Sequence, residues 1–136
     1  MAFREGHLYL GYIHLMDKSK FFVVARSCRL HAYIVPVNSE LPNVVAEKIP
    51  ECFIPIHPND VETAPPSASC LQYPSWLSVA PKRGRTLPSL LHRERPSFKP
   101  CGKVRTAVLE ALNTAIANCR ALKRKHRSLL LKETGC

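Results

Sequence analysis

The sequence predicts a small α+β protein, built from an N-terminal β-hairpin or short meander, a Pro-rich, partly disordered linker and one C-terminal basic amphipathic helix. Three observations lead to this prediction. Residues 7–37 are rich in β-branched and aromatic side chains, all twelve prolines lie between positions 36 and 100, and residues 103–132 contain neither proline nor glycine. The corresponding division of the 136 residues is a β-rich region at 1–58, a largely disordered basic linker at 59–102 and the helix at 103–133.

The N-terminal segment reads as two strands joined by a turn. The run "HLYLGYIHLM" is followed by the turn-like "DKSK" and then by "FFVVARSCRLHAYIVPV". The spacing predicts a hairpin centred near residues 17–20. In the second run, one set of alternating positions is the more apolar and is expected to face the core: Phe22, Val24, Arg26, Cys28, Leu30, Ala32 and Ile34. Because an isolated hairpin is barely stable in water, short edge strands are expected in residues 38–58.

Residues 59–102 show neither helical nor strand periodicity. Proline fixes φ and removes a backbone donor, so a run this rich in proline favours extended chain over regular structure. The sequence therefore predicts a linker here. Trp76 is the one tryptophan of the chain, and it either docks back on the core or anchors a partner.

The C-terminal segment carries one apolar stripe at alternating spacings of four and three, as on one face of an α-helix. The stripe consists of Val108, Leu112, Ala115, Cys119, Leu122, His126 and Leu129. Arg120, Lys123, Arg124 and Arg127 fall on another face, about a third of a turn away. The helix is thus expected to dock with one side and to present cations with another.

The basic excess belongs to the last 55 residues. Residues 1–81 contain six Lys/Arg and seven Asp/Glu, a net charge of −1, whereas residues 82–136 contain fourteen and three, a net of +11. Such asymmetry indicates a polyanionic partner. It predicts a non-catalytic accessory or regulatory protein that binds RNA or DNA through the phosphate backbone, and nothing in the sequence predicts sequence specificity. The predicted contacts are Lys82, Arg83, Arg85, Arg120, Lys123, Arg124, Lys125 and Arg127.

Three other interpretations of the basic residues stay open. The cations could solvate the helix and offset its macrodipole at the C-terminal end. The runs "PKRGR" and "KRKHR" also resemble nuclear-import addresses. An acidic protein or an anionic membrane surface would be a further polyanionic partner.

Six cysteines stand at positions 28, 52, 70, 101, 119 and 136, with no C-x-x-C pair and no secretory signal before them. We interpret them as reduced thiols of a nuclear or cytoplasmic protein that is not secreted. No charge-free apolar run free of proline approaches the roughly 20 residues of a membrane helix.

Only one group resembles a zinc site: Cys28 and His31 with Cys52 and His57. The argument is weak, because a spacing of three within a strand sends Cys28 and His31 to opposite faces. No cofactor is therefore expected. The chain also has no phosphate-binding glycine loop and no nucleophile motif, so we expect a protein that is not an enzyme.

Two rival functions differ in class from nucleic-acid binding. A protein-interaction adaptor would use the apolar helix stripe or the "LPSLL" segment at 87–91, which has the L-x-x-L-L pattern of groove-binding helices. An overprinted reading frame would explain the scattered cysteines, abundant proline and weak strand alternation. Small viral accessory proteins, which engage host components, share this style of composition.

Overall fold

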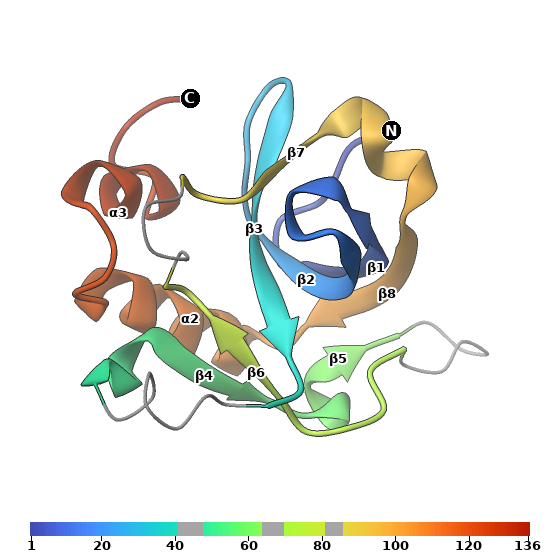
Figure 1. Ribbon diagram of the computed structural model, residues 1–136, viewed down its shortest axis with the longest axis horizontal. Coiled ribbons are helices and arrows are strands. Elements are labelled where there is room, and N and C mark those ends of the chain that lie inside the picture. The colour runs from blue at the N-terminus through green and yellow to red at the C-terminus, as the bar shows by residue number, and fades with distance from the viewer. Residues whose placement is uncertain (41–47, 64–69, 81–85) are drawn as a thin grey trace.

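The predicted fold class is wrong, because the chain forms one curved β-sheet with short helices. A computed structural model describes residues 1–40, 48–63, 70–80 and 86–136. In these residues, eight strands pair antiparallel into a sheet that closes about half of a barrel (Figure 1). The strand order is β4-β6-β3-β2-β1-β8-β5, and β7 adds to β3. The strands are β1 His7–Ile13, β2 Lys18–Ser27, β3 His31–Asn38, β4 Phe53–Ile56, β5 Val61–Glu62, β6 Ser75–Ser78, β7 Ser89–Leu91 and β8 Lys99–Val104.

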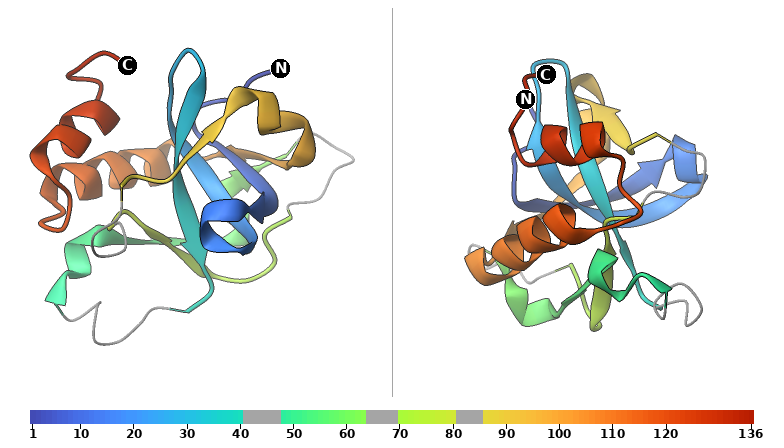
Figure 2. Two further views of the ribbon diagram at one scale, coloured as in Figure 1. Left: turned by 45° about the horizontal axis from the view of Figure 1, so that its top comes forward. Right: turned by 90° about the vertical axis from the view of Figure 1, so that its left-hand side faces the viewer.

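Helical segments fill the connections of the described chain. Two are α-helices, α2 Thr106–Asn118 and α3 Arg124–Leu130, and both lie on the same side of the sheet (Figure 2). Four are 3₁₀ turns: η1 His14–Met16, η2 Pro50–Cys52, η3 Pro58–Asp60 and η4 His92–Ser97. No helix of the described residues is long and apolar enough to cross a membrane.

A hairpin does form close to the predicted turn, but it lies inside the larger sheet. Strands β1 and β2 pair antiparallel with Leu8 opposite Val23, and η1 connects them. Asp17 ends the turn in the left-handed conformation, with φ 53°. Asp tolerates this conformation better than most residues, because its short side chain can hydrogen-bond locally.

The run at residues 21–37 forms two strands, with a turn at 28–30 that the alternation pattern did not reveal. Both faces of β2 are buried, because the curved sheet packs on both sides. Phe22 and Val24 enter an aromatic cluster with Phe3, Tyr9 and Phe98. Val23 and its partner Val35 enter the main core although they lie outside the expected set. Of the seven expected core positions, four are buried, whereas Leu30 is 70% exposed.

The predicted linker is also wrong, because its described residues include four of the eight strands in whole or in part: β5, β6 and β7 lie within 59–102, and β8 begins there and ends at Val104. β4 precedes this segment and pairs with β6 at the edge of the sheet. Pro55 is exposed in the edge strand β4, where proline is tolerated because the backbone N–H that it lacks would point to solvent. Trp76 lies half-buried in β6, opposite Asn38 and Pro55, and thus docks on the sheet.

The single helix at 103–133 is replaced by the end of β8, α2 and α3. The predicted stripe nevertheless faces the core along α2, where Val108, Leu112 and Ala115 are buried. Cys119 then leaves the helical conformation, with φ −71° and ψ 109°. Its side chain is completely buried in a disulfide with Cys52, which ties the end of α2 to η2. Leu122 is also buried in the core, so the chain turns inward before α3 begins.

The interpretation of the cysteines as reduced thiols is wrong, since the structure pairs all six. Besides Cys52–Cys119, the disulfides are Cys28–Cys136 and Cys70–Cys101. Each joins segments that are distant in sequence. They connect the β2–β3 turn to the C-terminus, and the segment before β6 to β8.

Candidate nucleic-acid interface

Three of the predicted cations lie together where α3 begins. Lys123 is the N-cap of α3, and Arg124 and Lys125 are its first two residues. All three side chains are exposed, and none takes part in an ion pair within the described chain. We call these three residues the α3 cluster. The first turn of α3 contains no acidic residue, so nothing there neutralises their charge.

The break between α2 and α3 removes one structural explanation of this cluster. Cations near the C-terminus of a helix are stabilised by the macrodipole, but cations at an N-terminus are opposed by it. In a continuous helix the cluster would occupy the C-terminal third. In the structure it occupies the N-terminus of α3, where it weakens the helix slightly instead of stabilising it.

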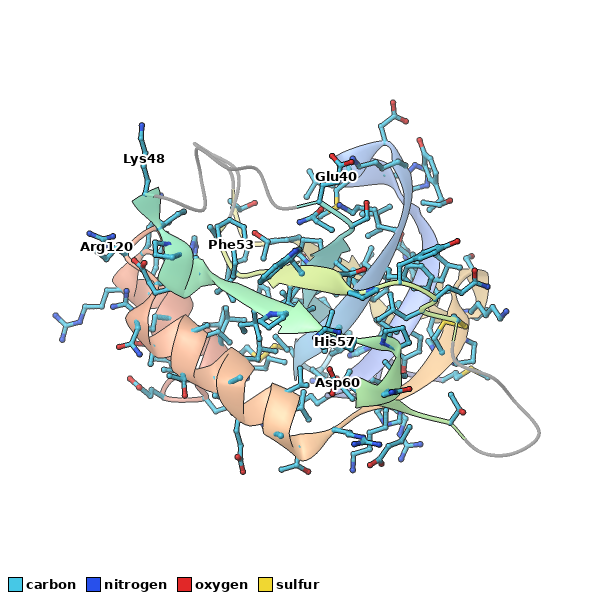
Figure 3. All side chains as sticks on the ribbon, turned by 90° about the horizontal axis from the view of Figure 1, so that it is seen from below. Glu40, Lys48, Phe53, His57, Asp60 and Arg120 are labelled. Atoms are coloured by element: carbon cyan, nitrogen blue, oxygen red, sulfur yellow. A yellow bond between two sulfur atoms is a disulfide. The ribbon has the colours of Figure 1, made fainter. Side chains whose placement is uncertain are left out.

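Arg120 and Arg127 have partners within the protein. The exposed Arg120 donates from Nε to Glu51 Oε1 at 2.7 Å and from Nη2 to the Lys48 carbonyl at 2.8 Å. Arg120 and Lys48 are labelled in Figure 3. The hydrogen bond between the two side chains raises the pKa of Arg120 and lowers the pKa of Glu51. Arg127 is half-buried and donates to the carbonyls of Cys119 at 2.9 Å and Ile116 at 3.3 Å. Arg127 therefore caps the C-terminal end of α2.

His126 follows the α3 cluster on the same helix. Desolvation by burial lowers the pKa of His126, and the charges of Lys125 and Lys123 lower it further. Its Nδ1 atom is buried without a hydrogen-bond partner among the described atoms. The imidazole is thus neutral near pH 7, and protonation would add a fourth positive charge.

The remaining predicted contacts, Lys82, Arg83 and Arg85, lie outside the described residues.

A second group of cations, which the sequence pattern did not indicate, lies at the opposite end of α2. Lys103 in β8 stands opposite His7 in β1, and Arg4 and Arg105 flank this pair in the chain. Arg4, Lys103 and Arg105 are exposed. Desolvation by burial lowers the pKa of His7, and the charges of Arg4 and Lys103 lower it further, which places both cations near the ring. No sequence signal links these residues, because strand pairing joins positions about a hundred residues apart.

The weak zinc candidate fails on its cysteines. Cys28 is bonded to Cys136 and Cys52 to Cys119, so neither offers a thiolate ligand. His31 and His57 are left without cysteine partners. In the described parts of the chain, no three His, Cys, Asp or Glu side chains are grouped so that they could hold a metal ion.

Ser27 and His92 are in contact, as a nucleophile and its general base would be, but the ring proton of His92 is on the wrong nitrogen for that role. Ser27 Oγ lies 3.2 Å from His92 Nε2. His92 Nδ1 accepts a hydrogen bond from the Phe3 backbone N–H at 3.1 Å, so the proton of the neutral ring is on Nε2, which donates to the Cys28 carbonyl at 2.8 Å. A ring in this tautomer cannot take the serine proton. His92 instead joins the N-terminus to the β2–β3 turn.

A cavity of about 430 Å³ lies between the β1–β2 region and the two helices. Its lining is about equally polar and apolar, and its apolar residues include Leu109, Leu112 and Leu130. Its charged lining residues are Glu5 and Lys132, which form an ion pair at 2.6 Å. Although burial raises the pKa of Glu5, hydrogen bonds from Lys132 and from the Ser27 backbone outweigh it, so the net shift is downward. The two charges satisfy each other and leave neither free for a charged ligand.

Most of the apolar side chains that a protein-interaction adaptor would use are buried. The apolar stripe of α2 is buried in the core. Leu87 and Leu90 of "LPSLL" are buried as well, whereas Leu91 is exposed, and the last three residues of the segment form strand β7 in place of a helix.

Comparison with known proteins gives no relative from which to infer a function. No protein family, no curated protein and no solved structure matches the chain.

Proposed function

We propose that this protein is a non-catalytic accessory protein that binds RNA or DNA through the charged phosphate backbone, with the α3 cluster as its main contact. The observation that carries the proposal is that Lys123, Arg124 and Lys125 are exposed, adjacent and placed at a helix N-terminus, with no ion pair to any described residue. Intramolecular stability does not account for them there. A polyanionic partner accounts for these three cations, because each phosphate that a cation neutralises releases bound counterions.

The charge of the surroundings favours the same partner. Between Glu110 and Glu133 the sequence contains no acidic residue. Glu51, the ion-pair partner of Arg120 three residues before the α3 cluster, is already neutralised by that arginine. The run "KRKHR" at 123–127, which contains the α3 cluster, also fits a nuclear-import address.

A protein that contacts only the phosphate backbone does not read the bases, and its affinity depends strongly on the salt concentration. Each phosphate contact contributes about 0.9 to the slope of log K against log salt for duplex DNA. Removing the three cations of the α3 cluster should lower that slope by up to about 2.7. If the variant and wild type bind equally at 1 M salt, this change in slope makes the affinity of the variant roughly 10³-fold lower at 50 mM salt.

The experiment compares the triple variant Lys123→Ala, Arg124→Ala, Lys125→Ala with wild type, by fluorescence anisotropy on labelled duplex DNA and RNA at several salt concentrations. A matched control removes three exposed cations elsewhere, Lys18, Arg29 and Lys99. The proposal predicts that the control binds almost as wild type does, whereas the α3-cluster variant loses most of its affinity. Wild-type protein that binds neither polymer at 50 mM salt, or equal losses in the two variants, would show that the proposal is wrong.

A further inference from the structure

The two groups of cations stand at the two ends of one helix. The 13 residues of α2 extend about 20 Å at 1.5 Å per residue. The α3 cluster follows its C-terminal end, and Arg4, Lys103 and Arg105 surround its N-terminal end. We call these three residues the β8 cluster. Figure 3 shows both ends: Arg120 lies at one, and Asp60, whose carbonyl accepts a hydrogen bond from the Arg105 N–H, lies toward the other.

We propose that the nucleic-acid backbone lies along the solvent face of α2 and is bound at both ends, by the β8 cluster at one and by the α3 cluster at the other. This inference rests on the proposed function and extends its binding surface beyond the C-terminal residues. It assigns a role to Arg4, Lys103 and Arg105, which lie far in sequence from the basic run.

The solvent face of α2 suits a polyanion, because its side chains are short and nearly all neutral. Short side chains allow a phosphate backbone to come close to the helix. Glu110 is the one charged member of this exposed set. The set consists of Thr106, Ala107, Glu110, Ala111, Asn113, Thr114, Ala117 and Asn118.

The β8 cluster keeps a positive charge after its acidic neighbours are counted. Glu62 stands opposite Lys103 in the pairing of β5 with β8 and offsets one of the three cations. Asp60 offers its backbone carbonyl to the Arg105 N–H, and its carboxylate accepts from the His57 N–H at 2.8 Å. His7 can add a further charge when a bound phosphate raises its pKa.

The distance between the clusters sets a minimum length for the ligand. Duplex DNA carries one charge per roughly 1.7 Å of axis, so 20 Å corresponds to about 12 charges, or six base pairs. A shorter duplex can occupy one cluster at a time. A longer duplex can occupy both, and the second contact is then intramolecular.

The test uses two DNA ligands, a 24-base-pair duplex and a hairpin with a four-base-pair stem, and three variants. These are Lys103→Ala with Arg105→Ala, the triple alanine variant of the α3 cluster, and the control Lys18→Ala with Lys99→Ala. For the long duplex at 50 mM salt, we expect the β8-cluster variant to lose roughly 100-fold in affinity, from a slope reduced by about 1.8. For the short hairpin, we expect it to lose about twofold at most, because the intact α3 cluster still binds it.

A second readout does not depend on affinity. The His7 imidazole resonances should titrate at higher pH when the 24-base-pair duplex is bound than when the protein is free, since phosphate would lie beside Arg4 and Lys103. Thermal unfolding of each variant checks that the fold is kept, and Lys103→Arg should retain binding if the charge is what matters.

The outcomes separate this inference from the proposed function. If wild type binds the long duplex and only the α3-cluster variant loses affinity, while the His7 titration does not move, the α2 surface is wrong and the proposed function stands. If wild type binds neither ligand, both are wrong. Equal losses of the β8-cluster variant and its control would also overturn the α2 surface, because they would show an effect of net charge alone.

Discussion

At the scale of single residues, Gly11 shows how closely the aromatic cluster packs on the sheet. A Cβ built on Gly11 would overlap the ring of Phe98. Phe98 is buried, and its ring centroid lies 5.3 Å from that of Phe22 and 5.6 Å from that of Phe3. The ring has no free space to move into, since interiors are packed as densely as organic crystals.

We therefore predict that Gly11→Ala lowers the free energy of unfolding by about 1–3 kcal/mol. Urea denaturation followed by circular dichroism measures the change. Gly135→Ala is the matched control, because no heavy atom lies within 4 Å of the position of its Cβ. Equal stability of the two variants would contradict the packing of Phe98 over β1.

At the scale of secondary-structure elements, α2 and α3 show why basic residues adjacent in sequence have different roles. The guanidinium of Arg127 reaches back across the break and donates to the Ile116 and Cys119 carbonyls at the C-terminal end of α2. Arg124, one turn earlier, is exposed and has no such partner among the described residues.

From this difference we predict opposite effects of two substitutions that remove the same charge. Arg127→Ala should lower the free energy of unfolding by about 1.5–3 kcal/mol, because it removes charged hydrogen bonds to half-buried carbonyls. Arg124→Ala should change it by no more than about 0.5 kcal/mol, yet weaken nucleic-acid binding. Unfolding curves and anisotropy titrations on the same samples measure both effects. A stability loss for Arg124→Ala as large as that for Arg127→Ala would contradict the assignment.

At the scale of the whole molecule, three disulfides join distant parts of a chain whose core is divided into two clusters. They connect residues 108, 67 and 31 positions apart. Closing a loop of this length lowers the entropy of the unfolded chain, which stabilises the folded state by about 3–5 kcal/mol for each disulfide. Disulfides persist in oxidising compartments and are rare in the cytosol and nucleus. The nuclear or cytoplasmic location stays a prediction.

For the native protein we predict no free thiol. Alkylation in denaturant without reductant should leave the intact mass unchanged, and alkylation after reduction should add six groups. Replacing Cys52 and Cys119 together by alanine should lower the free energy of unfolding by about 2–5 kcal/mol. Six alkylated cysteines before reduction would contradict the pairing. A single cooperative unfolding transition would also argue against the overprinted reading frame, whose residues would not have been selected for packing.

Local patterns in the sequence determined the concentration of charge in the last 55 residues, the first hairpin and the apolar stripe of α2. Each is set by composition or by side-chain periodicity over a few turns or one strand pair. The tertiary structure alone decided that His7 meets Lys103, that Cys119 pairs with Cys52 and breaks the helix, and that proline-rich chain joins a sheet. Those features depend on contacts between distant residues, whose free energy comes from packing and register, and local periodicity carries no information about either.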